Sequence, residues 1–313
     1  MPFRYTLRQL EYFVAVGKAG SISAASDILN VSSPSISAAI NQLEAEFGID
    51  LFVREHARGL SLTKAGHKFL ERTEFVLKEA ELLATLAGEI TGKVQGVLSV
   101  GCLVTFAQIV LPRLRREFED IYPAVRIDQR ELNQADIFSQ LRRAELDIAL
   151  TYDLDIPADL DFQPLLDLPP YVVLNEGHPL ATRDQIAITD LRDLPMVLLD
   201  LPYSSEYFLS FFRQADIKPN VAERTRDMSV MRSLVANGFG FSIANVRPLN
   251  NLSPDGKELI FVPLKDDLRP MKFGLLKARI ENETNTMTAF ITHCQSAVEA
   301  DKLPFSQAQP STL

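Results

Sequence analysis

One long helical pattern divides this sequence into two unequal parts. From Thr63, a residue suited to begin a helix, the pattern continues without interruption to Thr91, which corresponds to a helix about 42 Å long. Its inward side chains recur at alternating intervals of four and three residues, at Phe69, Thr73, Val76, Ala80, Leu83, Ala87 and Ile90. A helix that lies on its own domain drifts toward a period of about 3.6 residues, whereas about 3.5 is typical of a coiled coil. We therefore predict a dimerising linker helix over residues 63–92.

The net charge of the chain argues at first against a nucleic-acid partner. The 313 residues carry a formal charge of −9, whereas nucleic acids attract basic surfaces. Most of the excess acid lies beyond the linker helix, because residues 1–93 have a net charge of only −1. The overall charge therefore describes the larger C-terminal part and does not exclude DNA binding by the first part.

The sequence lacks the residues that several classes of function require. No apolar run approaches the ~18 residues that span a bilayer, and the first residues lack a signal-peptide core, so we expect a cytoplasmic protein without a membrane partner. Cys102 and Cys294 cannot form a disulfide framework, and the four histidines have no metal-ligand spacing. No nucleophile and base stand at a recognisable spacing. We expect no metal, no cofactor and no enzymatic activity, with oxidation sensing by a cysteine as a minor alternative.

The first 60 residues show the start and stop signals of three short helices. Thr6 and Gln9 form a capping box at the start of the first helix, and the second helix follows Gly20. Ser33 is expected to cap the third helix, which should run from Pro34 to Phe47 and stop at the following glycine. The spacing thus predicts a compact three-helix module.

The third helix has an unusual outer face. Its predicted buried stripe consists of Ile36, Ala39, Ile40, Leu43 and Phe47. The opposite face carries small or uncharged side chains, namely Pro34, Ser37, Ala38, Asn41 and Ala45, with Ser35 and Gln42 on the flanks. A merely solvated face normally carries Lys and Glu, whereas small residues and amides suit a helix in the major groove of DNA. An ordinary three-helix packing module remains the alternative.

A β-hairpin is predicted after the third helix. Apolar residues alternate over residues 49–62 around a turn at Arg58-Gly59, which is typical of a wing. Basic residues that could contact phosphates gather there and nearby, at Arg4, Arg8, Lys18, Arg54, His56, Arg58, Lys64 and Lys68. Surface charge unrelated to DNA is an equally good interpretation of this pattern alone.

Residues 94–300 alternate between strand and helix patterns and are therefore predicted to be α/β. Strands are expected at Val97–Val100, Val125–Ile127, Ile148–Thr151, Tyr171–Leu174, Met196–Leu199, Phe241–Ala244, Leu259–Val262 and Lys272–Leu276. Helices are expected between them, for example at Arg113–Asp120, Ile137–Ala144 and Met228–Asn237. The last residues, 303–313, have the composition of a disordered tail.

These residues resemble the LysR-type transcriptional regulators. The resemblance begins with LRQLEYFVAVGKAGSISAASDILNVSSPSISAAINQLEAEFGIDLFVREHARGLSLTKAG and continues through LPRLRREFEDIYPAV, ELDIALTYD, HPLA, ITDLRDLPMVLL and LVANGFGFSIA, in the order and spacing of the family. It covers nearly the whole chain to about residue 300. No single motif carries it, and the phrases of the C-terminal part vary widely within the family.

The resemblance implies an α+β multidomain fold. Residues 1–62 would form a winged helix-turn-helix, residues 63–92 the linker helix, and residues 93–302 an effector-binding domain of two Rossmann-like lobes similar to periplasmic binding proteins. Lobe 1 would comprise about 93–167 and 265–302, and lobe 2 about 168–264. The two hinge crossovers are expected near Leu166–Leu168 and Val262–Leu264.

The resemblance also assigns residues to DNA. The residues implied are Ser23, Ser33, Pro34, Ser35, Ser37, Ala38, Asn41 and Gln42 at the helix-turn-helix, with Arg54 and Arg58 on the wing. Many members of the family have Arg where this chain has Ala38, which suggests that a charged contact is replaced by contact with a thymine methyl group. Because the amides of Asn41 and Gln42 match adenine, we expect an A/T-leaning half-site.

Ligands of such α/β lobes bind beyond the carboxyl ends of the strands, where helix N-termini favour anions. The loops at these positions supply Thr105, Phe106, Gln134, Tyr152, Ser204, Ser205 and Asn245. Thr105 and Ser204 match the family positions that anchor an effector carboxylate, while Phe106 and Tyr152 would form apolar walls. For each hydroxyl, the alternative is nearly as good: the side chain would only cap the N-terminus of its own helix and would not bind an effector.

The sequence therefore predicts a transcriptional regulator that binds double-stranded promoter DNA. We expect coiled-coil dimers that assemble into a homotetramer, with a small-molecule effector, of the carboxylate type, bound between the lobes. The alternative is a cytoplasmic small-molecule-binding protein without a DNA function.

Overall fold

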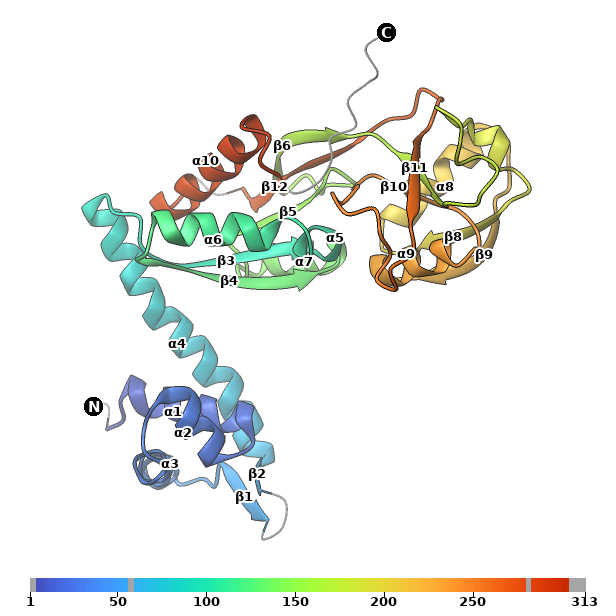
Figure 1. The fold of residues 1–313 in the computed structure, drawn as a ribbon. Helices are drawn as coiled ribbons and strands as arrows, with labels where there is room; N and C mark the ends of the chain where they lie inside the picture. Colours follow the sequence, from blue (N-terminus) through green and yellow to red (C-terminus); the bar gives the residue numbers. More distant parts are fainter. Residues whose placement is uncertain (1–3, 56–58, 280–282, 304–313) are drawn as a thin grey trace. The chain divides into compact units, whose positions relative to one another are not determined.

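The computed structural model describes residues 4–55, 59–279 and 283–303 (Figure 1). The chain forms two compact units, residues 1–90 and 91–313. Each unit has its own hydrophobic core. The predicted tail beyond Leu303 lies outside the described residues.

The first unit consists of helices followed by a hairpin and one long helix. Its elements are α1 (Leu7–Ala19), α2 (Ile22–Leu29), α3 (Ser33–Phe47), β1 (Phe52–Glu55), β2 (Gly59–Leu62) and α4 (Lys64–Thr91). The predicted capping box of Thr6 and Gln9 is present at the start of α1. Phe13 is fully buried at the centre, and its ring lies 5.5 Å from that of Phe52 on the hairpin and 5.3 Å from that of Phe69 on α4. One aromatic side chain thus joins helix bundle, wing and linker helix.

The start of α3 differs from the prediction, whereas its end at Phe47, followed by Gly48 as the C-cap, is as predicted. The helix begins at Ser33, and its N-cap is Ser32, because the backbone of Ser32 is extended and its carbonyl accepts the first helical hydrogen bonds from Ser35 and Ile36. Pro34 is tolerated as the second residue because the first helical N–H groups have no partner inside the helix. Phe47 was predicted to be buried, but 38% of it is exposed at the end of the helix.

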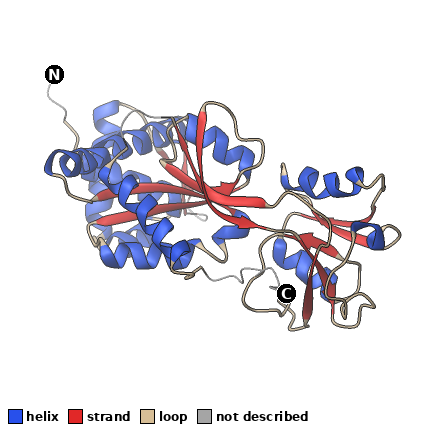
Figure 2. Cartoon of the chain, turned by 90° about the horizontal axis from the view of Figure 1, so that it is seen from above, coloured by secondary structure: helices blue, strands red, loops and turns tan. Residues whose placement is uncertain are grey.

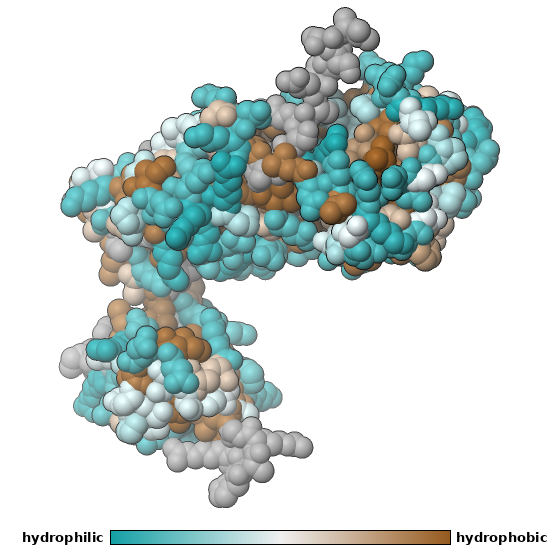
Figure 3. Space-filling model, viewed as in Figure 1, coloured by the Kyte–Doolittle hydropathy of each residue, from teal (hydrophilic) through white to brown (hydrophobic). Residues whose placement is uncertain are grey.

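The burial of apolar side chains on the long helix α4 changes along its length. Its first turns pack on the helix bundle through Phe69, Leu70 and Leu77, and Thr73 is buried there. From Phe75 onward the helix exposes several apolar side chains, namely Phe75, Val76, Leu82, Leu83, Leu86 and Ile90. The predicted stripe therefore changes role. Its first two positions pack within their own unit, and most of its later positions are exposed. Apolar surface along this part of α4 is visible in Figure 3.

The second unit contains two groups of strands (Figure 2). In lobe 1 the strand order is β4-β3-β5-β12-β6, with β3 (Gly96–Leu103), β4 (Val125–Leu132) and β5 (Ile148–Tyr152) parallel. The returning strand β12 (Met271–Ala278) is antiparallel to both β5 and β6 (Leu160–Leu168). The helices of this lobe are α5 (Val104–Ala107), α6 (Leu111–Ile121), α7 (Gln134–Arg142) and α10 (Asn285–Glu299).

Lobe 2 is built on smaller sheets. Strand β7 (Tyr171–Asn175) lies between β10 (Ser242–Ala244) and β11 (Leu259–Pro263), and β8 (Pro195–Leu199) pairs with β9 (Asn220–Thr225). The helical segments are η1 (Ile188–Leu191), α8 (Ser204–Gln214) and α9 (Met228–Ala236). The sequence did not predict β6 or β9. Both are edge strands, and β6 contains Pro164, which a central strand would not tolerate.

The two crossovers between the lobes lie slightly later than predicted. Strand β6 continues to Leu168, which pairs with Met271, so the first crossover is Pro169-Pro170. After β11, Leu264 still forms a bridge with Ile186 inside lobe 2, and the Asp266 carboxylate accepts a hydrogen bond from the N–H of Ile188, so the second crossover lies between Asp266 and Met271. In both cases a regular strand extends further than its apolar run.

Candidate DNA-binding surface and effector cleft

The structure places the predicted groove-facing residues on one surface of the first unit. Pro34, Ser35, Ala38, Asn41 and Gln42 are exposed on α3, while Ser33 and Ser37 are half-buried, and Ser23 is exposed on α2. The buried side of α3 consists of Ile36, Ala39, Ile40 and Leu43, which are four of the five residues predicted for it. A helix with apolar residues inside and small polar residues outside can approach a nucleic-acid groove closely.

Hydrogen bonds fix part of this surface. Gln42 Oε1 accepts a hydrogen bond from Gln9 Nε2 at 2.6 Å, which ties α3 to α1. The hydroxyls of Ser32 and Ser35 lie 2.8 Å apart. These contacts reduce the conformational freedom that the side chains would lose on binding.

Hydrogen bonds attach the hairpin to α3. Glu44 Oε1 accepts hydrogen bonds from the backbone N–H groups of Leu51 at 2.8 Å and Phe52 at 3.2 Å. A hollow of about 310 Å³ lies between helix and hairpin, with Ser37 and Asn41 among the residues that line it. The backbone of Arg54 is in β1 opposite Leu60, but Arg58 and His56 lie outside the described residues.

The predicted phosphate-contacting rim is only partly available. Arg4, Lys64 and Lys68 are exposed. Lys18, however, forms a salt bridge with Glu74 at 2.8 Å, and Arg8 lies over the ring of Tyr12. The basic residues with the fewest competing contacts therefore lie around the start of α4 and the N-terminus.

Four predicted effector residues meet at the edge of lobe 1. Thr105 is on α5, Gln134 begins α7 and Tyr152 ends β5, and all three are buried. Gln134 Nε2 donates hydrogen bonds to the carbonyls of Tyr152 and Leu154. Phe106 is fully buried and packs against the rings of Tyr152 at 4.7 Å and Phe273 at 4.5 Å, so it supports this edge from the core.

In lobe 2, Asn245 contacts the first crossover, whereas no such contact is seen for Ser204 and Ser205 among the described residues. Its Nδ2 donates to the carbonyl of Leu168 at 2.6 Å, immediately before the first crossover. Ser204 is buried at the start of α8. The Ser205 hydroxyl instead donates to the carbonyl of Leu201 at 3.1 Å, which is the role of a group that serves its own helix.

Tyr207, which the sequence did not single out, connects both crossovers. Its hydroxyl donates to the carbonyl of Arg269 at 2.7 Å in the second crossover and lies 3.3 Å from Asn245 Nδ2. Burial raises the pKa of Tyr207 to about 12, so the hydroxyl remains a neutral donor at physiological pH. Tyr207 lies one turn after Ser204 on α8, and this spacing was the sequence signal that could have placed it on the same side of the helix as Ser204.

Buried polar atoms without hydrogen-bond partners gather near this junction. Among the described residues they include Thr105 Oγ1, Gln134 Oε1, Tyr171 OH and Asn245 Oδ1. Burial raises the pKa of Tyr152, and the neighbouring Thr105 hydroxyl partly opposes this rise. Since buried polar groups are nearly always paired in proteins, this set favours a polar ligand between the lobes.

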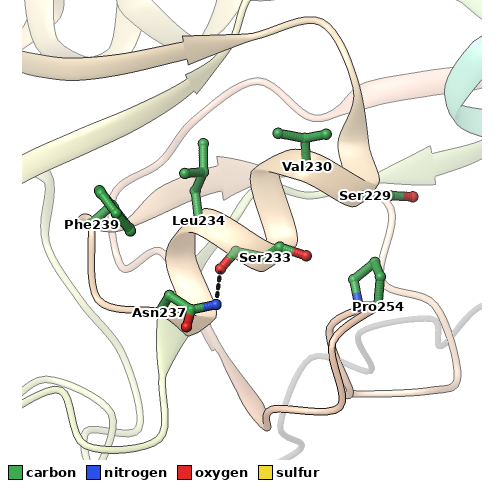
Figure 4. Close-up of a pocket in the computed structure, with 7 residues that line it drawn as sticks. All are labelled: Ser229, Val230, Ser233, Leu234, Asn237, Phe239 and Pro254. Carbon is green, nitrogen blue, oxygen red and sulfur yellow. Dashed lines mark hydrogen bonds between the residues drawn. The ribbon is translucent and has the colours of Figure 1, made fainter.

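A separate hollow of about 300 Å³ lies on the outer side of α9 (Figure 4). Its lining residues are Ser229, Val230, Ser233, Leu234, Asn237, Phe239 and Pro254. The N–H groups of Ser229 and Val230 already bind the Asp227 carboxylate, so this helix N-terminus does not attract an anion. The hollow contains none of the buried atoms that lack partners, and we therefore do not assign the effector to it.

The two cysteines are poorly suited to redox chemistry. Cys102 and Cys294 are buried, and burial raises the pKa of both thiols, which disfavours the reactive thiolate. Among the residues that the structure describes, no cluster of His, Cys, Asp and Glu side chains could hold a metal ion. In the same part of the chain, no helix combines the length and apolar character needed to cross a membrane.

Comparison with known proteins agrees with this arrangement. A family model described as bacterial regulatory helix-turn-helix protein, lysR family, matches residues 7–67, and one described as LysR substrate binding domain matches residues 91–299. The Hca operon transcriptional activator HcaR of Escherichia coli (strain K12) is 31% identical over 240 residues, which cover 76% of this chain and 80% of that protein. The HTH-type transcriptional regulator AlsR of Bacillus subtilis (strain 168) is 29% identical over 251 residues, or 79% of this chain and 83% of that protein.

Solved structures extend the likeness to the whole chain. HinK, a LysR family transcriptional regulator from Pseudomonas aeruginosa, is 32% identical with a TM-score of 0.64, covering 94% of this chain and 99% of that chain. Full-length CbnR complexed with its target DNA shares the fold with a TM-score of 0.68 at 22% identity, over 93% of this chain and 99% of that chain. The chain therefore belongs to the LysR family and is a DNA-binding transcriptional regulator with an effector-binding domain, not an enzyme.

Proposed function

We propose that this protein is a cytoplasmic regulator that binds promoter DNA and responds to a small anionic effector of the carboxylate type. The observation that carries the effector proposal is the group of buried polar atoms without partners at the junction of the two lobes. Hydroxyl groups such as that of Thr105 can donate to a carboxylate, and the amide of Gln134 can bind other polar groups of the effector. We keep the proposed division into residues 1–62, 63–92 and 93–302.

We propose that DNA is contacted by the exposed face of α3. The set consists of Ser23, Ser33, Pro34, Ser35, Ser37, Ala38, Asn41 and Gln42, with Arg54 and Arg58 near the phosphates. Exposure of small side chains on α3 supports close approach to base edges. Residues 1–93 have a net charge of −1, so binding relies on groove fit, a local basic rim and the avidity of an oligomer.

Replacing Asn41 by Ala is expected to lower the affinity for the specific operator by about 5- to 150-fold. One good bidentate contact between an amide and adenine contributes ~1–3 kcal/mol of discrimination. Fluorescence anisotropy with the operator and with a scrambled sequence measures the effect, and the affinity for scrambled DNA should stay unchanged. Lys68→Ala is the comparison variant, because a phosphate contact should weaken binding to both sequences alike. Equal affinity of the wild type and Asn41→Ala for every operator variant would remove Asn41 from base recognition.

An effector can regulate only if it binds two states of the protein with different affinity. Asn245 provides a physical connection, because its Nδ2 holds the carbonyl of Leu168 beside the first crossover while its Oδ1 is buried without a partner. We propose that the effector pairs with this residue and thereby changes the relative position of the lobes. In a tetramer made of two dimers, such a change would alter the spacing of the recognition helices and the bend of the DNA.

A further inference from the structure

Two arginines in lobe 2 stack on a single aromatic ring. The Cζ atom of Arg232, on α9, lies 5.5 Å from the centroid of the Phe261 ring, and that of Arg247, after β10, lies 4.9 Å from it. The ring of Tyr171, at the start of β7, meets the same phenylalanine at 5.5 Å in an edge-on arrangement. Four elements of the lobe thus bring two cations and a phenol together around Phe261.

The two arginines differ in how their donors are satisfied. Arg232 is only 7% exposed, and its Nη2 donates to the carbonyls of Asn250 at 2.8 Å and Leu252 at 2.7 Å. It therefore fastens the following loop to α9. Arg247 is half-buried, and its Nη2 makes a long contact of 3.4 Å with the Asn251 side chain. Its Nε has no hydrogen-bond partner in the part of the chain that the structure describes. Arg247 is thus the arginine whose N–H groups remain available to a ligand.

The cluster lacks a compensating negative charge. Neither arginine forms a salt bridge with any carboxylate in the described part of the chain. Burial lowers the pKa of Arg232, because removing this cation from water disfavours its charged form. Buried cations are normally paired with an anion, because an unpaired one is strongly destabilising.

Tyr171 adds an unpaired donor to this positive environment. The residue is 6% exposed, and its hydroxyl has no hydrogen-bond partner among the described residues. Burial raises the pKa of Tyr171 well above its ordinary value, so the hydroxyl stays protonated. The same buried neighbourhood therefore offers an O–H group and an N–H group without acceptors, beside two guanidinium charges.

We propose that Arg247 and Tyr171 form an anion-binding subsite in lobe 2 that receives an oxyanion group of the effector. This inference rests on the proposed effector-binding function and specifies where the negative charge would be bound. Tyr171 directly follows the first crossover, and Arg247 is two residues after Asn245, so the subsite adjoins the proposed cleft. A carboxylate, sulfate or phosphate group would accept from both donors and balance the arginine charge.

The test uses the full-length protein and thermal unfolding with sodium acetate, sulfate or phosphate, at ionic strength matched with sodium chloride. We expect at least one of these anions to raise the Tm of the wild type beyond the chloride control. Arg247→Met should raise the concentration needed for half of this shift at least tenfold, and Tyr171→Phe should raise it less. The anion that acts at the lowest concentration distinguishes a carboxylate subsite from a phosphate or sulfate subsite.

Sulfate and phosphate also stabilise proteins without a specific site, so the comparison between variants is decisive. Arg213→Met is the matched control, because it removes one exposed arginine of the same lobe that pairs with Glu206, and it should respond like the wild type. Arg247→Lys keeps the charge but loses the Nε donor, and an intermediate response is expected even if Arg247→Met folds poorly.

Two results would overturn the subsite. One is a wild-type Tm that follows the chloride control with all three anions, and the other is an equal anion response of Arg247→Met and the wild type. Binding of the same proteins to operator DNA is measured in parallel. If DNA binding persists while the anion response is absent or unchanged by the substitutions, the subsite is wrong and the proposed regulatory function stands.

Discussion

Replacing Leu83 by Glu is expected to dissociate the protein into monomers and to weaken operator binding by about 100-fold or more. Leu83 is 66% exposed and Ile90 78% exposed on the second half of α4. Large exposed apolar stretches usually mark interaction surfaces, and the spacing of these residues is that of a coiled coil. A buried glutamate on each helix would place unpaired charges in the interface.

The loss of DNA affinity follows from avidity. Two linked recognition helices gain about 10²- to 10⁴-fold over one, without any new contact. Analytical ultracentrifugation measures the assembly state, and anisotropy measures operator binding. Leu249→Glu is the matched control, because Leu249 is 70% exposed in lobe 2 and receives the same change at nearly the same exposure. A Leu83→Glu protein that remains a dimer with unchanged operator affinity would contradict the proposed role of α4.

Replacing Gly66 by Ala is expected to destabilise the first unit by about 3 kcal/mol, toward the upper end of the range for overpacking. A methyl group on Gly66 would lie 2.1 Å from the carbonyl oxygen of Leu51. That carbonyl cannot move away freely, because it accepts a hydrogen bond from the N–H of Thr63 at 3.0 Å. The start of α4 and the entry to the hairpin must therefore separate, which also disturbs the wing.

Chemical unfolding followed by circular dichroism measures this effect. Gly177→Ala is the control, since a methyl group there meets no atom within 4 Å, and its stability should match the wild type. Operator affinity of Gly66→Ala should fall even at temperatures where the protein remains folded. Equal unfolding midpoints for Gly66→Ala and Gly177→Ala would show that the helix and hairpin do not pack as described.

Local signals predicted most helices and strands because they act within a few residues. The capping box at Thr6 and Gln9 and the apolar side of α3 depend only on neighbouring residues, and both are present in the structure. Strand β6 was missed because an edge strand tolerates Pro164 and polar residues, so its pattern resembles a loop. The family fold predicted from the resemblance is confirmed by the family models and the solved structures.

The candidate cleft was predictable only in part. The rule that ligands bind beyond the ends of strands identified Thr105, Gln134 and Asn245, whose buried atoms without partners appear only in three dimensions. Tyr207 and Arg247 were not selected, although Tyr207 lies one turn after Ser204, because their importance depends on partners far along the chain, the carbonyl of Arg269 for Tyr207 and the ring of Phe261 for Arg247. No local pattern reports such contacts.

The most direct test of the central claim is binding of the purified full-length protein to the DNA upstream of its own gene. Anisotropy at low salt should show saturable binding that exceeds binding to scrambled DNA by about 10³-fold or more, and its affinity should fall as salt is raised. Binding no stronger than to scrambled DNA, or no binding even at low salt, would contradict the assignment of α3 as a recognition helix for this DNA.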